Sequence, residues 1–141
     1  MTRKAAAVWQ GGLKDGRGTI STDSGVLAQA QYSFSTRFES GAGTNPEELI
    51  AAAHAACFSM ALSGQMGNAG LSVGEIRTTA TVTLEKLDAG WTLTQVHLDA
   101  AVRSPGADRA AFDQAAQNAK AGCPISRVLN AKISMEARLE G

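Results

Sequence analysis

Hydrophobic and polar positions in the first 40 residues follow the pattern of short strands separated by turns. Strands are expected over residues 5–9 and 19–21, and a turn is expected at residues 23–25. From Tyr32 to Phe38 aromatic residues alternate with polar ones, which predicts a strand with the aromatic rings on one face and Arg37 on the other. The N-terminal part is therefore predicted to be β-rich.

A long apolar segment follows a helix-start signal. Residues 44–46 offer a capping residue and a proline suited to the first turn, and Glu47 and Glu48 complement the positive end of a helix. The predicted helix body, residues 49–66, is rich in alanine and has no clear polar face, which is typical of a buried helix. We expect that the 141 residues of one chain do not suffice to wrap it.

The second half of the chain shows strand, helix and strand signals in succession. The expected elements are an antiparallel hairpin over residues 75–103 with a turn at 88–90, a helix from a cap at Asp108 to Gly122, a short helix over 125–129 and a strand over 132–139. This order predicts an α+β fold rather than an alternating βαβ one, and we expect one domain over residues 1–141.

Composition and charge exclude several classes of protein. Apolar residues make up 44% and charged residues 18% of the chain, which is close to the globular average. With 13 Lys and Arg against 13 Asp and Glu, the chain offers no basic stripe for nucleic acid. No export signal is visible, and residues 49–62 fall short of the roughly 18 apolar residues of a membrane span. We expect a cytoplasmic protein without a membrane or nucleic-acid partner.

The two cysteines are the main candidates for chemistry, because two are too few for a secreted disulfide scaffold. Cys57 lies inside the apolar helix, where it either packs as a small hydrophobe or needs a cation, such as Arg37, to become reactive. Cys123 precedes Pro124 in the position of a helix N-cap, which favours a thiolate but also suits a purely structural cap. A peroxidatic and resolving pair is possible.

The histidines and acids give weaker signals. His54 and Cys57 are neighbours on one helix face, which suits a general base or half of a metal site, but Cys123 and His97 lie in no ligand spacing. We interpret His54 as a packing or hydrogen-bonding residue. Glu47 has an alternative role at the helix start, worth about 1 kcal/mol. Because a helix rises about 1.5 Å per residue, Glu47 lies roughly 15 Å from Cys57 and cannot touch it within one straight helix.

The chain contains four short sequence segments at matched spacing. In chain order they are TRFE at 36–39, TNPEEL at 44–49, AAHAACFSMAL at 52–62 and AGCP at 121–124. They resemble the signature segments of the osmotically inducible protein C and organic hydroperoxide resistance (OsmC/Ohr) family, and more closely its OsmC branch. The resemblance runs from near Trp9 to the last strand. It implies antiparallel sheets wrapped around a central buried helix, and an intertwined homodimer with two active sites at the subunit interface.

The resemblance also implies a thiol peroxidase that reduces organic hydroperoxides in oxidative stress defence, without haem, flavin or metal cofactors. Cys57 matches the peroxidatic cysteine, Cys123 the resolving cysteine, and Glu47 the acid that pairs with the active-site arginine. That arginine matches Arg37 in the OsmC branch, whereas the Ohr branch uses one nearer the N-terminus, around Arg17 here. We expect Arg37. The implied reductant is an external dithiol of the lipoyl type.

Three other functions stay open from the residues alone. The cysteine pair would suit a redox sensor, which needs to react only once and slowly. An apolar cavity would suit a carrier of a small hydrophobic ligand, which should survive the loss of Cys57. A structural stress protein would use both cysteines as core residues.

Overall fold

The computed structural model describes residues 1–140, which divide into two compact units, Met1–Leu49 and a second one that begins at Ile50. The boundary lies within the longest helix, α2 (Pro46–Asn68), whose first turn belongs to the first unit. A helix starting at Pro46 agrees with the start signal in the sequence. The expected single domain over residues 1–141 stays a prediction.

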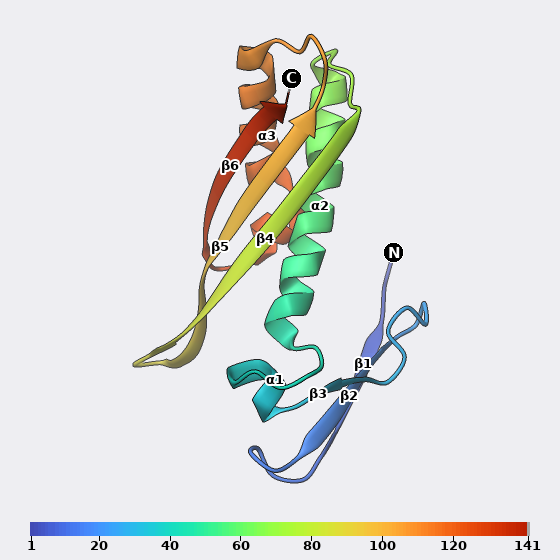
Figure 1. The fold of residues 1–141 in the computed structure, drawn as a ribbon, viewed down its shortest axis with the longest axis vertical. Coiled ribbons are helices and arrows are strands. Elements are labelled where there is room, and N and C mark those ends of the chain that lie inside the picture. The colour runs from blue at the N-terminus through green and yellow to red at the C-terminus, as the bar shows by residue number, and fades with distance from the viewer. Residues whose placement is uncertain (141) are drawn as a thin grey trace. The chain divides into compact units, whose positions relative to one another are not determined.

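The first unit contains a three-stranded antiparallel sheet in the order β1-β2-β3, drawn in blue in Figure 1. Its strands are β1 (Ala5–Gln10), β2 (Arg17–Thr22) and β3 (Ala30–Tyr32). The β-rich start is therefore confirmed. All six residues of β1 are exposed within this chain, so the sheet has no fully covered face of its own.

The segment after β3 forms a helix, so the predicted strand with alternating aromatic residues is wrong. Ser33 caps α1 (Phe34–Phe38): its backbone N–H donates to Thr36 Oγ1 (2.8 Å), and its Oγ accepts from the backbone N–H of Thr36 (3.3 Å). This capping box satisfies the helix start locally, which outweighs the alternating pattern. Arg37 does not face away from the aromatic rings, because its guanidinium lies 5.2 Å from the ring centroid of Phe38.

The second unit contains a three-stranded sheet in the order β4-β5-β6. The long hairpin is confirmed, with β4 (Glu75–Leu87) and β5 (Gly90–Arg103) antiparallel, and Gly90 at the turn has a φ of 116°. The last strand, β6 (Lys132–Glu140), pairs parallel to β5, so this sheet is mixed rather than antiparallel throughout. A parallel partner requires a crossover connection, which the helices between β5 and β6 provide.

Two helices connect β5 to β6. Asp108 caps α3 (Arg109–Gly122), because its carboxylate accepts a hydrogen bond of 2.9 Å from the backbone N–H of Ala111. Cys123 is both the C-cap of α3 and the N-cap of α4 (Pro124–Val128). The predicted N-cap positions of the two helices, Asp108 and Cys123, are therefore confirmed.

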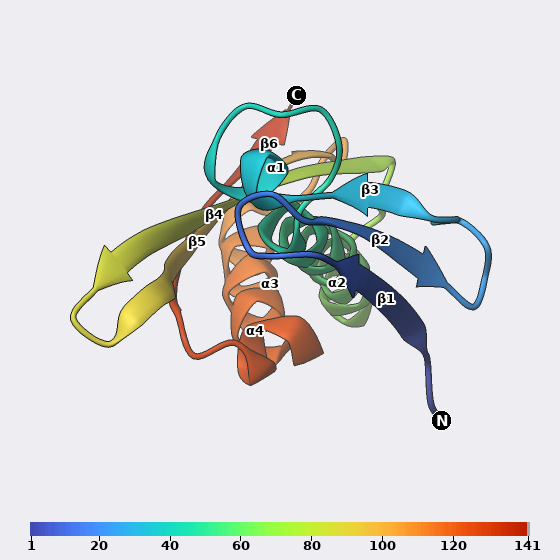
Figure 2. The same ribbon diagram turned by 90° about the horizontal axis from the view of Figure 1, so that it is seen from below.

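The core of the second unit lies between the sheet and helices α2 and α3, which cover the same face of the sheet in Figures 1 and 2. It consists of aromatic and aliphatic side chains from α2, β5 and α3: Phe58, Leu62, Met66, Val96, Leu98, Ala100, Val102, Phe112, Ala115, Ala116 and Ala119. The α+β fold class is thus confirmed, with the predicted helix at the centre of this core.

Only one stripe of α2 is buried within this chain. The buried residues recur at every fourth position from His54 to Met66, whereas Met60 on another side is 78% exposed. The expectation that this segment is too short for a membrane span is not met, because α2 runs to Asn68 and by length and composition alone is long and apolar enough to cross a membrane. Of its apolar 18-residue window, 22% is buried. This is a weak indication of a span, because the core helix of a soluble protein passes the same test.

Candidate active site

The structure brings the two predicted cysteines together. The thiol of Cys57, in the middle of α2, lies 2.8 Å from that of Cys123, at the start of α4, although 66 residues separate them in the chain. Both are free thiols, Cys57 half-buried and Cys123 buried. An S–S bond measures about 2.05 Å, so oxidation of the pair to a disulfide, with loss of two electrons and two protons to an oxidant, would require only a small approach of the two sulfurs.

The surroundings of Cys57 favour its neutral form. Burial raises the pKa of the Cys57 thiol, and the adjacent Cys123 raises it as well, by a hydrogen bond and by charge. The backbone N–H of Ile125 donates to the Cys57 sulfur and lowers the pKa, without reversing the net direction. A nearby cation would be needed to make Cys57 a thiolate at neutral pH.

The first turn of α4 therefore donates a hydrogen bond to Cys57 and not, as expected, to Cys123. The sequence predicts that the free N–H groups of this helix favour a thiolate at Cys123, but the Cys123 side chain makes no capping hydrogen bond. Because Cys123 packs with its sulfur against α2, the N–H of Ile125 reaches Cys57 instead. A residue in the middle of one helix thus receives a donor from the first turn of another.

A second polar bridge joins α2 to α4 beside the thiols. Nε2 of His54 lies 2.8 Å from Oγ of Ser126, and both residues are buried. His54 precedes Cys57 by three residues and Ser126 follows Cys123 by three, so the bridge lies one helical turn from each sulfur. Burial lowers the pKa of His54, and its Nδ1 has no hydrogen-bond partner among the described residues. His54 is confirmed as a hydrogen-bonding residue, whereas Ser126 was not foreseen.

The first unit carries an arginine and an acid in contact. Nη2 of Arg37 donates to Oε1 of Glu47 at 2.8 Å, and Nε donates to the same carboxylate at 3.0 and 3.3 Å. Asn45 holds the two helices that supply them, because its Nδ2 donates to the carbonyl of Thr36 (3.0 Å) and its Oδ1 accepts from the N–H of Glu48 (2.7 Å). The pairing of Glu47 with Arg37 is therefore observed.

Arg17 occupies a different place. No ion pair within the part of the chain that the structure describes involves Arg17, and its side chain lines a cavity of about 410 Å³ along β2. The cavity beside Arg37 is smaller, about 280 Å³, and mainly apolar. Its lining is Trp9, Leu13, Tyr32, Ser33, Phe34, Arg37 and Phe38. The aromatic rings and a cation thus meet in one cavity of the first unit.

A family model covers most of this chain. The OsmC family model, described as OsmC-like protein, matches residues 39–138. The chain belongs to the OsmC family. Peroxiredoxin OsmC of Escherichia coli (strain K12) is 54% identical over 138 residues, which are 98% of this chain and 96% of that protein.

More distant relatives agree with this assignment. The organic hydroperoxide resistance protein of Xanthomonas axonopodis pv. citri (strain 306) is 31% identical over 129 residues, 91% of this chain and 88% of that protein. Among solved structures, the organic hydroperoxide resistance protein OhrB of Bacillus subtilis aligns with a TM-score of 0.70 and 25% identity, covering 96% of this chain and 98% of that one. The resemblance seen in the sequence is confirmed.

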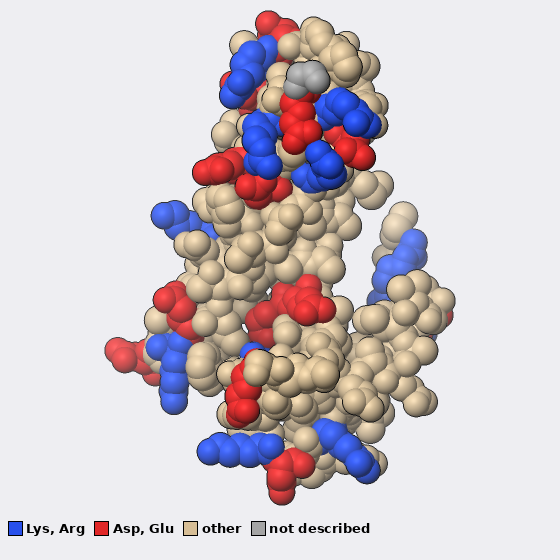
Figure 3. Space-filling model, in the orientation of Figure 1, with Lys and Arg blue, Asp and Glu red and all other residues tan. Residues whose placement is uncertain are grey.

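The matched region of this OsmC family member includes Glu47, Cys57 and Cys123, whereas Arg37 lies two residues before it. The roles of these four residues stay predictions. Acidic and basic side chains are interspersed on the face shown in Figure 3, without a broad basic patch on that face. Within the described residues, three metal-ligating side chains gather at one place only, on β5 and β6, and not at the thiol pair.

Proposed function

We propose that this protein is a thiol peroxidase that reduces organic hydroperoxides to alcohols in oxidative stress defence. As a member of the OsmC family whose relatives are named Peroxiredoxin OsmC and Organic hydroperoxide resistance protein, it is an oxidoreductase of the peroxidase class. The observation that carries the proposal is the 2.8 Å separation of the Cys57 and Cys123 sulfurs. Thiols at this separation pass from a sulfenic acid to a disulfide with little movement.

Cys57 is the proposed nucleophile and Cys123 the resolving thiol. The Cys57 thiolate attacks the distal oxygen of the hydroperoxide, the O–O bond breaks, and the alkoxide takes up a proton and leaves as the alcohol. The Cys123 sulfur then attacks the sulfenic sulfur of Cys57, forming the disulfide and releasing water. An external dithiol reduces the disulfide, so that each turnover consumes one hydroperoxide and one dithiol.

Arg37 is the proposed cation for this reaction. Burial and Cys123 raise the pKa of Cys57, so a thiolate at neutral pH requires compensation by a positive charge. Glu47 holds the Arg37 guanidinium through two of its nitrogens, which fixes its plane. A guanidinium placed at Cys57 would stabilise the thiolate and then the alkoxide as negative charge moves onto it.

We further propose that a second copy of the chain supplies Arg37 and Glu47 to Cys57. Glu47 and Cys57 belong to the continuous helix α2, and ten residues of α-helix rise about 15 Å. The exposed apolar side of α2, with Met60 78% exposed, offers a surface that a second copy would cover. The proposed assembly is a homodimer with two such shared sites.

Mixing two inactive variants tests the shared site. Arg37→Ala lacks the cation and Cys57→Ser lacks the nucleophile, so a mixed dimer contains one complete site if the two groups come from different chains. After subunit exchange we expect recovery of about a quarter of the wild-type activity, because half of the dimers are mixed and each has one intact site. If both groups came from one chain, exchange would restore nothing. A catalytically competent monomer in sedimentation would also overturn this arrangement.

The cavity beside Arg37 supports an alkyl rather than a purely polar substrate. It encloses about 280 Å³ and is lined largely by aromatic rings, with Phe34 and Phe38 in contact at a centroid distance of 4.9 Å. An organic group in this cavity removes apolar surface from water, which hydrogen peroxide cannot do. We therefore propose alkyl or lipid hydroperoxides as substrates.

The proposed reaction uses no bound cofactor, because the two thiols carry both electrons. The reductant is an external dithiol, and we propose the lipoyl type, whose two linked sulfurs form a cyclic disulfide on oxidation. The proposed location is the cytoplasm, where thiols are kept reduced.

Turnover with a defined hydroperoxide tests the function directly. We would follow reductant consumption with cumene hydroperoxide and dihydrolipoamide, comparing the wild type with Cys57→Ser and Cys123→Ser. Multiple turnovers by the wild type and none by Cys57→Ser are expected, while Cys123→Ser should form the sulfenic acid but not the intramolecular disulfide. A wild type that reacted once and slowly would favour a redox sensor, and ligand binding unchanged in Cys57→Ser without turnover would favour a carrier.

A further inference from the structure

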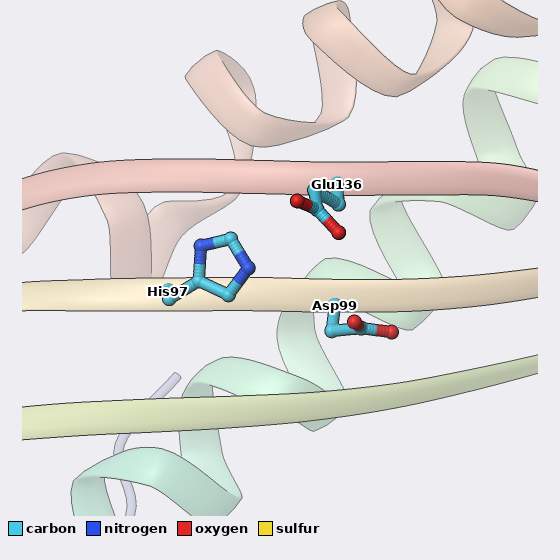
Figure 4. Close-up of side chains that lie close together, drawn as sticks. All are labelled: His97, Asp99 and Glu136. Atoms are coloured by element: carbon cyan, nitrogen blue, oxygen red, sulfur yellow. The ribbon is translucent and has the colours of Figure 1, made fainter.

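A group of metal-ligating side chains lies on the sheet of the second unit, away from the thiols. His97 and Asp99 on β5 and Glu136 on β6 form the β5–β6 cluster, whose candidate ligand atoms all lie within 4.8 Å of one another. Figure 4 shows the imidazole and the two carboxylates on the same side of the strands, with the helices behind. The neighbouring residues Val96 and Leu98 are buried in the core on the other face.

The sheet fixes these side chains next to one another. Asp99 is the register partner of Glu136 in the parallel pairing of β5 and β6, and His97 lies two positions before Asp99 on the same face. Because β5 is the central strand, with β4 on its other side, this register cannot slip without moving the core residues. The three side chains are thus held by rigid backbone rather than by a loop.

Two carboxylates side by side repel each other unless a cation lies between them. Arg138 compensates in part, because its Nη1 donates to Oδ1 of Asp99 at 2.7 Å and its charge also attracts the Glu136 carboxylate. The other oxygen of Asp99 makes no hydrogen bond, and the Glu136 carboxylate makes no hydrogen bond or ion pair, within residues 1–140. Negative charge on the cluster is therefore only partly neutralised.

The imidazole is oriented by a residue outside the cluster. Nδ1 of His97 lies 2.7 Å from Oγ of Ser134, its register partner on β6. When Nδ1–H donates to this hydroxyl, the lone pair of the imidazole is on Nε2. A hydrogen bond from the second ring nitrogen is the device that fixes the tautomer and the direction of metal-binding histidines.

We propose that the β5–β6 cluster binds one divalent transition-metal ion of the Zn²⁺ class, through Nε2 of His97 and one oxygen each of Asp99 and Glu136. One nitrogen and two carboxylate oxygens suit Zn²⁺, whereas Mg²⁺ and Ca²⁺ prefer oxygen ligands alone. Ligand atoms bound at about 2.0–2.2 Å to one tetrahedral ion lie about 3.4 Å apart, so the three ligand atoms, now within 4.8 Å of one another, would approach by up to about 1.4 Å. Solvent supplies the remaining ligands.

The proposed ion acts as a clip between β5 and β6. It joins a strand from the hairpin to the strand that ends the chain, on the sheet face opposite the core that contains Phe58. Binding to the folded sheet stabilises it by mass action. The site is independent of the proposed peroxidase reaction, because neither cysteine belongs to it.

Zn²⁺ titration by calorimetry tests the site in a chain without competing thiols. The parent protein carries Cys57→Ser and Cys123→Ser, and His97→Gln, Glu136→Gln and the control Asp88→Asn are made in it, Asp88 being an exposed acid at the hairpin turn. We expect one Zn²⁺ per chain, at least tenfold weaker binding for the first two variants, and a change below twofold for the control. Mg²⁺ at equal concentration should not compete.

Nitrogen-15 NMR of labelled histidines gives a second readout that does not depend on activity or on stability. Zn²⁺ should shift the ring resonances of His97 and leave those of the buried His54 unchanged. The proposal is overturned if Zn²⁺ does not bind the parent, if His97→Gln binds it equally well while folded by circular dichroism, or if Mg²⁺ displaces it. The last two outcomes would indicate a diffuse attraction of cations to acidic residues.

Discussion

The two units of this chain differ in how they are held together. Within residues 1–140, every buried hydrophobic side chain lies between residues 58 and 123, in the second unit, whereas β1 of the first unit is exposed along its whole length. The buried residues of the first unit, all of whose residues are described, are Gly18, which has no side chain, and Thr36. The second unit can therefore define its fold by its own core, while the first depends on its helix caps and hydrogen bonds.

The same division separates the chemical groups. The thiol pair lies in the unit with the core, where packing holds the two sulfurs in contact. The Arg37–Glu47 pair lies in the unit without one, with the arginine side chain 39% exposed and the glutamate 12%. The sulfurs are thus brought together by the folding of one unit, whereas Arg37 is held by Glu47 within its own unit and reaches Cys57 only in the proposed assembly.

The largest expected effect concerns the core. Phe58 is completely buried between α2 and the sheet, so Phe58→Ala should lower the free energy of unfolding by about 3–5 kcal/mol. Trp9, in β1, is 38% exposed, and Trp9→Ala should cost less than half as much. Urea unfolding at one fixed protein concentration measures both. Equal losses for the two variants would contradict the contrast between the units.

The next largest effect concerns catalysis. Arg37→Ala should lower kcat/KM for cumene hydroperoxide by about 10²–10³-fold, because the Cys57 thiolate and the leaving alkoxide lose their proposed cation. Arg37→Lys should recover only part of the activity, since an ammonium cannot bind Glu47 through two coplanar nitrogens. Arg17→Ala is the matched control and should stay within about twofold of the wild type. A larger loss for Arg17→Ala than for Arg37→Ala would transfer the role to Arg17.

Most of the fold could be predicted because local signals agreed with the tertiary structure. The hairpin turn at Gly90, the cap at Asp108 and the start of α2 at Pro46 each depend on residues close in sequence. The strand predicted from Tyr32 to Phe38 was wrong because two signals conflict in this segment. Alternating aromatic residues indicated a strand, while the hydrogen bonds between Ser33 and Thr36 stabilise a helix of only five residues.

The candidate members of the site come from the resemblance to the OsmC/Ohr family, and their roles stay predictions, whereas their contacts could not be foreseen. That the Ile125 N–H donates to Cys57, and that Ser126 bonds to His54, follows from how α4 packs against α2, about 70 residues away in the chain. No pattern in a single sequence encodes that packing.

A smaller effect concerns the pH dependence of stability. Burial lowers the pKa of His54 in the folded state below the usual value of 6.5, so the unfolded chain binds more protons at acidic pH. The free energy of unfolding should therefore be unaffected by His54 above pH 6.5 and decrease as the pH falls below it, by at most about 1.4 kcal/mol per pH unit for one proton.

Substitution of His54 separates this effect from general acid sensitivity. His54→Gln should flatten the decline in stability between pH 6.5 and 5. Because His54→Gln also changes the bond to Ser126, the slope with pH and not the absolute stability is compared. An unchanged slope in His54→Gln would show that other groups cause the acid sensitivity.

The smallest effect compares the helix caps of the two units. Ser33→Ala removes the cap of α1 and Asp108→Ala that of α3, and each should lower the free energy of unfolding by about 1 kcal/mol. Only Ser33→Ala should also lower kcat/KM, by a few-fold, because Arg37 lies in the last turn of the short helix α1, whereas Cys123 lies at the opposite end of the 14-residue helix α3 from the Asp108 cap. If both variants kept full activity, the position of Arg37 would be set by Glu47 and not by α1. If both lost activity equally, stability alone would explain the change, and the first unit would have no special part in placing the cation.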